Sequence, residues 1–260
     1  MLLVQKVSIF LVLIFLEILS VVCAFKILVV NPSSSVSHSM LSLKITEALI
    51  KKGHHVSSAG YFSLKIPFTN YTHIHFSKPD NLYVSYYNLK FFTSSKLEKW
   101  FQINLIRNYA KTICGKEFAS DFVRKFLQEI DHYDIILTQR YSCYWSLMHR
   151  FRAPLVKISP LGIPGWVGRK FANPTHPAYI QNAALDLGNP MSFWERLENL
   201  IVGLYQNFFY DLFVMSIGED TAREYFGQDI PSIDNTARNM SLLWVNSYFS
   251  FFFPRPLVPG

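Results

Sequence analysis

The sequence predicts an α/β fold, a parallel sheet with helices on both faces, and three observations support it. The first predicted strand is an uninterrupted apolar run, which suits a strand buried on both faces of a parallel sheet. Residues 25–60 then follow the order strand, loop, helix, strand. Further short apolar runs alternate with helical stretches along the rest of the chain.

The first unit can be predicted residue by residue. The apolar run at 27–30 predicts a strand, and the polar, proline-containing stretch after it predicts a loop. From about Ser39 the apolar residues recur on one side of a helix, which is expected to end at Gly53. A second strand is expected at 56–59.

His38 lies where this loop meets the helix. Ligands of open α/β sheets bind beyond the carboxyl ends of the strands, and this is the first such end in the chain. A helix N-terminus disfavours positive charge, so an imidazole here is expected to stay neutral and able to accept a proton. The alternative is a solvated histidine, or one bound to local backbone. Because the loop has no glycine, it is neither a dinucleotide fingerprint nor a phosphate loop.

Residues 1–24 have the pattern of a cleaved signal peptide. Lys6 provides the positive start, an apolar run covers 9–16, and small residues precede the expected cleavage site at Ala24. Glu17 interrupts the apolar stretch, which disfavours a membrane-spanning anchor. The mature chain is therefore expected to begin near Phe25 and to follow the secretory route.

Composition limits the partners that the chain could have. The net charge of +7 is spread along the 260 residues without a basic, aromatic-interleaved cluster, so no nucleic acid is expected as a partner. Cys114 and Cys143 could pair in an oxidising lumen or remain as buried free thiols. Asn70 and Asn239 open glycosylation sequons that the secretory route would make usable.

The remaining elements follow from periodicity and turn residues. Strands are expected at 71–76, 133–138, 153–158 and 242–246. Helices are expected in the second half of 81–115 and at 117–130, 142–151 and 219–226. The stretch 160–190 contains five prolines and four glycines and is expected to be irregular.

A long aromatic helix is expected from Ser192, which forms a capping box with Glu195. A wide apolar face of this kind usually packs in the core, although it could also touch a membrane surface or wall an apolar substrate pocket. The polar opposite face argues against a bilayer-spanning helix. The apolar face comprises Phe193, Trp194, Leu197, Leu200, Ile201, Leu204, Phe208 and Leu212, and the polar face comprises Glu195, Arg196, Glu198, Asn199, Gln206 and Asn207.

In combination, these motifs resemble the N-terminal half of an animal UDP-glycosyltransferase of the glucuronosyltransferase type. The matching text is ILVVNPSSSVSH, YDIILTQRYSCYW, NPTHPAYI, MSFWERLENLIVGLY, AREYFG and LLWVNSYFSFFFPRPLVPG. The resemblance implies a GT-B enzyme, in which two Rossmann-like domains face one cleft. Residues 25–260 are then expected to be the acceptor-binding domain, with the C-terminal nucleotide-sugar domain and the transmembrane helix absent.

The resemblance also makes His38 the catalytic general base, which takes the proton of the acceptor hydroxyl as its oxygen attacks the sugar with inversion. In the family an acidic residue orients this histidine, but the matching stretch around Gln139 has no carboxylate. Gln139 or Ser142 could hydrogen-bond the imidazole, with less stabilisation of an imidazolium. Arg140 would oppose that charge if it pointed inward, and Asp134 is expected at the far end of its strand.

By the same resemblance, the chain is expected to help transfer a hexose or glucuronic acid from a UDP-sugar to a small lipophilic acceptor. UDP-sugar would bind only with a C-terminal domain, and neither a metal nor a further cofactor is expected. The expected location is the lumen of the endoplasmic reticulum or its lumenal membrane face, with homo- or hetero-oligomers of family members as possible assemblies. The alternative is a non-catalytic truncated member that binds hydrophobic ligands or full-length partners.

Overall fold

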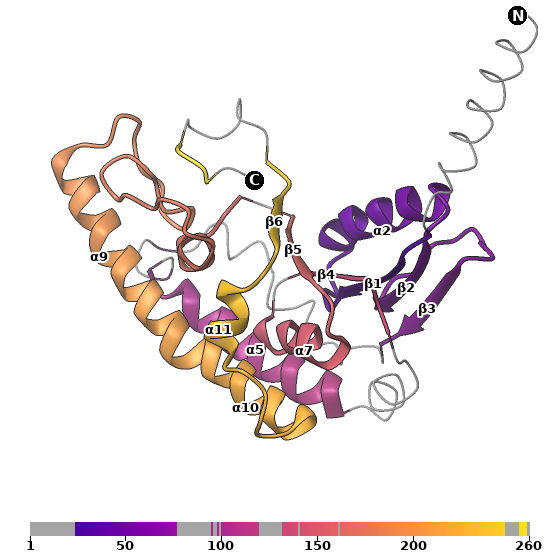
Figure 1. Ribbon diagram of the computed structural model, residues 1–260. Helices are drawn as coiled ribbons and strands as arrows, with labels where there is room; N and C mark the ends of the chain where they lie inside the picture. Colours follow the sequence, from indigo (N-terminus) through magenta and orange to yellow (C-terminus); the bar gives the residue numbers. More distant parts are fainter. Residues whose placement is uncertain are drawn as a thin grey trace, which may run out of the picture.

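A parallel β-sheet forms the centre of the computed structural model, which describes residues 24–76, 95, 98, 100–119, 132–139, 141–160, 162–247 and 255–258. Its strand order is β3-β2-β1-β4-β5-β6, and each neighbouring pair is parallel (Figure 1). The α/β fold with a parallel sheet is therefore confirmed. The strands are β1 (Lys26–Asn31), β2 (His55–Gly60), β3 (Tyr71–His75), β4 (Ile135–Gln139), β5 (Leu155–Ser159) and β6 (Leu242–Val245).

The expected strands all form, with ends displaced by no more than about two residues. Side chains of β1 alternate between the two faces of the sheet, with Leu28 and Val30 on one side and Ile27 and Val29 on the other. All four are almost fully buried, as the uninterrupted apolar run predicts.

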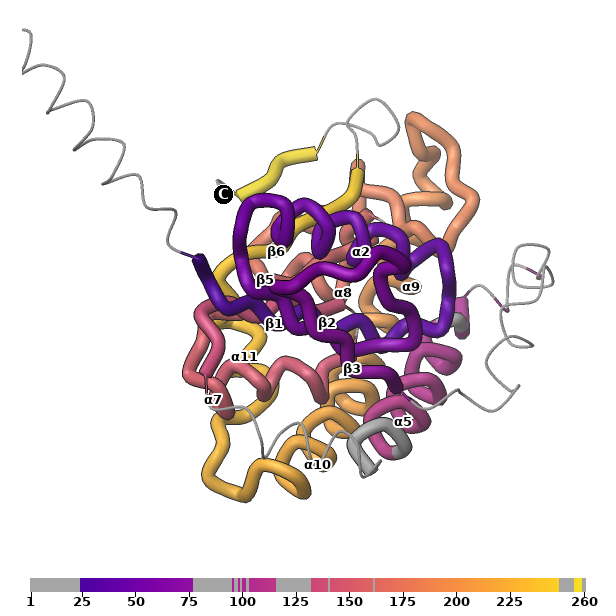
Figure 2. Tube along the Cα trace, turned by 90° about the vertical axis from the view of Figure 1, so that its right-hand side faces the viewer, coloured from indigo at the N-terminus to yellow at the C-terminus, as the bar shows by residue number. Residues whose placement is uncertain are grey.

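Helices cover both faces. The helix α2 (Val36–Lys51) packs Ile45 and Ile50 against the face that carries Ile27 and Val29. The opposite core contains side chains from α5 (Gln102–Ala119), α7 (Leu147–Phe151), α10 (Met215–Phe226) and α11 (Ile233–Arg238). Figures 1 and 2 show α2 and this second group on opposite sides of the strands.

Two expected helices differ in detail. The stretch 142–151 begins as a 3₁₀ turn, η2 (Ser142–Ser146), and continues as α7. The helix expected at 117–130 begins inside α5, and residues 120–131 lie outside the described part of the chain. The stretch 160–190 is irregular as expected, apart from the short helical turns α8 (Gly165–Gly168) and η3 (Arg169–Phe171).

The helix expected from Ser192 is longer than its pattern predicts. It comprises α9 (Phe193–Phe209), the π-helical turn η4 (Tyr210–Val214) and α10, which together form one helix of 34 residues. Its N-terminus carries the predicted capping box, in which Ser192 accepts a hydrogen bond from Glu195 N and donates its own N–H to the Glu195 carboxylate.

The apolar face of α9 is solvent-exposed, so the expectation that it packs in the core is wrong. Trp194 is 73% exposed and Phe208 is 66% exposed, whereas Asn199 and Gln206 from the polar face are buried. The reason is the irregular segment beneath the helix, whose backbone groups need hydrogen-bond partners.

Buried amides supply those partners. The Asn199 side chain donates to the carbonyls of Pro177 and Ile180, each at 2.7 Å, and accepts from Asn182 N at 2.8 Å. Asn182 in turn donates from its side chain to Gln206 at 2.7 Å. The polar face of α9 is thus the inner face, because it binds the irregular segment.

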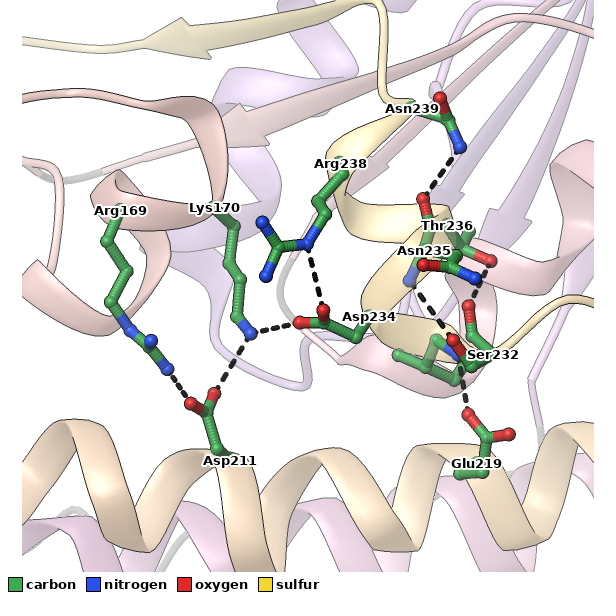
Figure 3. A network of polar contacts seen from close by, with 11 residues as sticks. Arg169, Lys170, Asp211, Glu219, Ser232, Asp234, Asn235, Thr236, Arg238 and Asn239 are labelled. Carbon is green, nitrogen blue, oxygen red and sulfur yellow. Dashed lines mark hydrogen bonds and ion pairs between the residues drawn. The ribbon is translucent and has the colours of Figure 1, made fainter.

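An ion-pair network fastens the π-helical turn to its neighbours (Figure 3). Asp211 in η4 pairs with Arg169 and with Lys170 of η3, and Lys170 also pairs with Asp234 at the start of α11. The Lys170 side chain is only 6% exposed, so its ammonium depends on these two carboxylates for compensation.

Cys114 and Cys143 form a disulfide, which decides between the two alternatives left open by the sequence. Both residues are fully buried, and the bond joins α5 to η2 across a sequence separation of 29 residues. Closing a loop of that size stabilises a fold by about 3–4 kcal/mol in the chain-entropy model.

Candidate active site

A cavity of about 130 Å³ lies beside His38, next to the ends of β4 and β5. Helices and turns that are distant in sequence supply its walls, which are mostly apolar and aromatic. A cavity of this size holds about one aromatic ring. Its lining includes His38, Ile106, Tyr109, Trp166, Tyr210 and Val214.

His38 is the third residue of α2, which begins three residues earlier than the sequence predicts. Its Nδ1 lies 3.0 Å from the hydroxyl of Ser35, the N-cap residue, and that hydroxyl lies 3.0 Å from the Ser37 hydroxyl. An Nδ1–H that donates to Ser35 leaves the lone pair on Nε2. Ser35 was not among the predicted site residues, although a serine N-cap three residues before the histidine is a usable signal.

Serine side chains also fix the loop that carries this histidine. Ser39 donates its hydroxyl hydrogen to the carbonyls of Ser33 and Ser35, at 3.1 and 2.9 Å. Ser33 N donates to the Asn31 side chain at 3.3 Å. The connection from β1 to α2 is therefore held by local hydrogen bonds, and the imidazole starts from a fixed backbone.

Either Gln139 or Ser142 could have hydrogen-bonded the imidazole, but among the described contacts neither does. Gln139 is fully buried at the end of β4, and its amide donates to the His38 carbonyl at 3.2 Å and to the Ser42 hydroxyl. Ser142 donates to the Val214 carbonyl at 3.5 Å. Gln139 supports the backbone of His38, while Arg140 lies outside the described residues.

Asp134 lies at the opposite end of the sheet from His38, as expected. Its carboxylate accepts a hydrogen bond from Lys26 N at 2.7 Å, at the point where β1 begins. That backbone hydrogen bond, followed by the hydrogen bond with His132, lowers the pKa of Asp134. The residue therefore stabilises the amino-terminal end of β1, far from the cavity.

Lys157 on β5 also lines the cavity and was not among the predicted site residues. It is 4% exposed, and its ammonium lies 4.4 Å from the centroid of the Trp145 ring. This cation–π contact helps to compensate for burial of the charge. The available signal was one lysine within an otherwise apolar strand.

Tyr210 provides a protonated phenol beside the cavity. Complete burial raises the pKa of Tyr210 well above its usual range.

Among the described residues, no group of three or more histidine, cysteine or acidic side chains could hold a metal ion.

Known proteins share this sequence pattern. The model of the family described as UDP-glucoronosyl and UDP-glucosyl transferase matches residues 25–260. The chain belongs to this family of UDP-glycosyltransferases.

The relatives are longer than this chain. UDP-glucosyltransferase 2 of Dactylopius coccus is 28% identical over 234 residues, which cover 86% of this chain and 44% of the relative. UDP-glucuronosyltransferase 2B13 of Oryctolagus cuniculus is 25% identical over 248 residues, which cover 86% of this chain and 45% of the relative. The chain thus spans less than half the length of these two family members.

A solved structure of Phytolacca americana UGT2 complexed with UDP-2fluoro-glucose and pterostilbene has a TM-score of 0.37 and 10% sequence identity. The match covers 86% of this chain and 48% of that one.

Proposed function

We propose that this chain is the acceptor-binding half of a UDP-glycosyltransferase, with His38 as its general base. The cavity beside His38 would hold a small lipophilic acceptor, and a C-terminal nucleotide-sugar half would present the UDP-sugar. The observation that carries the proposal is the juxtaposition, in a family member, of a histidine held through Nδ1 and an aromatic cavity at the carboxyl edge of the sheet.

In the proposed reaction, the acceptor hydroxyl oxygen attacks the anomeric carbon from the side opposite UDP. The bond between that carbon and the UDP oxygen breaks, UDP leaves with its charge, and the sugar is inverted. Nε2 of His38 takes the hydroxyl proton while Ser35 holds Nδ1–H. Ser35 orients the ring but has no charge, so the imidazolium is stabilised less than it would be beside a carboxylate.

The catalytic proposal is tested by joining the chain to the nucleotide-sugar half of a relative and measuring turnover with a simple phenol. His38→Ala should lower kcat by about 10²–10⁴. Ser35→Ala should lower it by about 3–10-fold, the value of one hydrogen bond. Unchanged turnover in the His38→Ala protein would reject the general-base role.

The acceptor pocket is tested separately by calorimetry on the chain itself. A phenol should bind, and Ser159→Phe should abolish binding because Ser159 lines the cavity and a ring there would fill it. UDP-sugar should not bind. Phenol affinity that is the same in the Ser159→Phe variant would place the acceptor elsewhere.

A second candidate is a non-catalytic family member that binds hydrophobic ligands or full-length partners. It is favoured by Gln139, a neutral residue committed to the His38 backbone at the place where the resemblance expects an acid. Phenol binding combined with no turnover in the joined protein would support this candidate.

We further propose that the chain matures in the lumen of the endoplasmic reticulum after removal of residues 1–24. The buried Cys114–Cys143 disulfide suits an oxidising compartment. Residues 1–23 lie outside the described residues, so sequencing the N-terminus of the mature protein purified from that compartment is the direct test. A mature N-terminus at Phe25 is expected.

A further inference from the structure

One stripe of α9 exposes large apolar side chains to solvent over about 30 Å of helix. Phe193 and Trp194 are 71% and 73% exposed, and Leu204 is 61% exposed. The outer apolar face consists of Phe193, Trp194, Leu197, Leu200, Ile201, Leu204 and Phe208 of α9, together with Leu212 of η4.

The outer apolar face is narrow and straight. At the helical angle of 100° per residue, its eight positions fall within an arc of about 120°. Figure 1 shows α9 along the outer edge of the molecule, on the opposite side from α2. A straight apolar stripe at the edge of the molecule can lie against a flat surface.

The other side of the same helix is bound to the protein. Asn199 and Gln206 hold the irregular segment, and Asp211 pairs with Arg169 and Lys170. By length and composition the 34-residue helix could cross a membrane, with a hydropathy of 1.4 in its apolar window and 28% of that window buried. Because crossing would break these polar contacts, the helix is suited to lie along a surface instead.

The charges around the stripe are complementary to an anionic surface. The carboxylates of α9 are engaged: Glu195 accepts from Gly188 N and Ser192 N, and Glu198 accepts from the Trp100 indole at 2.9 Å. Arg196 on α9 donates its Nε–H to the Met191 carbonyl at 3.0 Å, and its side chain remains exposed to solvent.

A second exposed cation borders the C-terminal end of the stripe. Arg107 of α5 packs its guanidinium 5.3 Å from the centroid of the partly exposed Phe213 ring. Apolar residues flanked by arginines suit the interfacial region of a bilayer, where anionic headgroups meet acyl chains. A second copy of the chain would instead bring the same cations against each other in a two-fold interface.

We propose that the outer apolar face of α9 is a membrane-binding surface, with the helix lying parallel to a phospholipid bilayer. The face inserts at the boundary between headgroups and acyl chains, and Arg196 and Arg107 meet anionic headgroups. The cavity lies close to this surface, since Tyr210 and Val214 of η4 follow α9 directly and line the cavity.

The test measures binding of the purified chain to vesicles of phosphatidylcholine with a minor fraction of phosphatidylserine. Co-sedimentation gives the partition coefficient, and lipids brominated near the headgroup should quench the fluorescence of Trp194. The triple variant Ile201→Ser, Leu204→Ser, Phe208→Ser should bind about 100-fold more weakly or worse, because three large side chains no longer enter the bilayer.

A matched control replaces three comparably exposed apolar residues elsewhere: Ile66→Ser, Leu242→Ser, Trp244→Ser. Ile66 is 61% exposed and Trp244 is 51% exposed, so this variant removes similar apolar surface. It should bind vesicles like the unchanged chain. Coincident thermal melting curves for each variant and the unchanged chain establish that the fold is intact.

Three results would overturn the proposal. The unchanged chain fails to bind these vesicles, or the triple variant binds as tightly as the unchanged chain. Alternatively, light scattering shows a dimer that the triple variant dissociates, without vesicle binding, which assigns the face to a second copy. Vesicle binding does not require His38, so this test and the turnover test fail independently.

Discussion

The Gln139 side chain supports the segment that carries His38 and does not contact the imidazole. Both of its amide hydrogens are used, on the His38 carbonyl and the Ser42 hydroxyl. Gln139→Glu should therefore lower the free energy of unfolding by about 1–3 kcal/mol, because a buried carboxylate cannot donate to that carbonyl. Urea denaturation measures the change, and equal stability would contradict this role.

His73 should make folding stability depend on pH. Burial, followed by the charge of His75, lowers its pKa to about 4 from an ordinary value of 6.5. Between those values the unfolded chain binds a proton that the folded chain does not, so stability falls as pH falls from about 6.5 to about 4.

Urea denaturation at several pH values across that window measures this slope. His73→Asn should reduce the slope without removing it, because burial also lowers the pKa of His149. A slope that is unchanged in the variant would assign the dependence to other groups.

The two sequons differ at the level of a single amide. Asn70 uses both side-chain N–H groups on the carbonyls of Ile50 and His54, at 3.1 and 2.7 Å, whereas Asn239 is exposed and uses one, on the Asn235 carbonyl at 2.9 Å. Because a glycan replaces one hydrogen of that nitrogen, a secreted chain should carry sugar at Asn239 and not at Asn70. Peptide mass spectrometry after glycosidase treatment decides between them, and a glycan at Asn70 would contradict this expectation.

At the scale of elements, α10 approaches η2 so closely that only glycine fits. A Cβ built on Gly218 would lie 2.1 Å from the Ser142 hydroxyl and 2.9 Å from its Cβ. Gly218→Ala should lower the free energy of unfolding by about 1–3 kcal/mol through overpacking.

The double variant Gly218→Ala, Ser142→Gly provides the control for this contact. It removes both crowded atoms and should cost less than the sum of the two single changes. Additive effects would show that the strain lies elsewhere.

The strand β1 could be predicted from sequence because burial on both faces leaves an uninterrupted apolar run, and β3 could be predicted from its alternation of polar and apolar residues. The helices were less predictable, and α9 shows why. Its spacing correctly separates an apolar face from a polar one, but periodicity does not say which face meets the protein. The polar face packs inward because carbonyls of the irregular segment accept hydrogen bonds from the Asn199 side-chain amide.

At the scale of the whole molecule, the disulfide ties α5 to η2. Replacing both cysteines with serine should lower the free energy of unfolding by about 3–4 kcal/mol, since the unfolded chain loses a closed loop. Denaturation of the unchanged chain with and without a reducing agent provides the comparison. A loss below about 1 kcal/mol would show that packing alone fixes these elements.

The site could be predicted only in part. The place of His38 could be predicted, because the strand and loop before it put the residue near the carboxyl end of β1, where the cavity lies. Lys157 and the absence of a contact between Gln139 and the imidazole depend on side-chain directions between distant segments. A single sequence carries no direct signal for these.

The same disulfide also bears on selectivity. Ile106 and Tyr109 on α5 form one wall of the cavity, and Tyr141 and Ser142 beside Cys143 form another. The covalent bond limits how far these walls can separate, so under the proposed function it would set an upper limit on the width of an acceptor. By the same proposal, a chain with the disulfide reduced should accept bulkier acceptors and discriminate less between small ones.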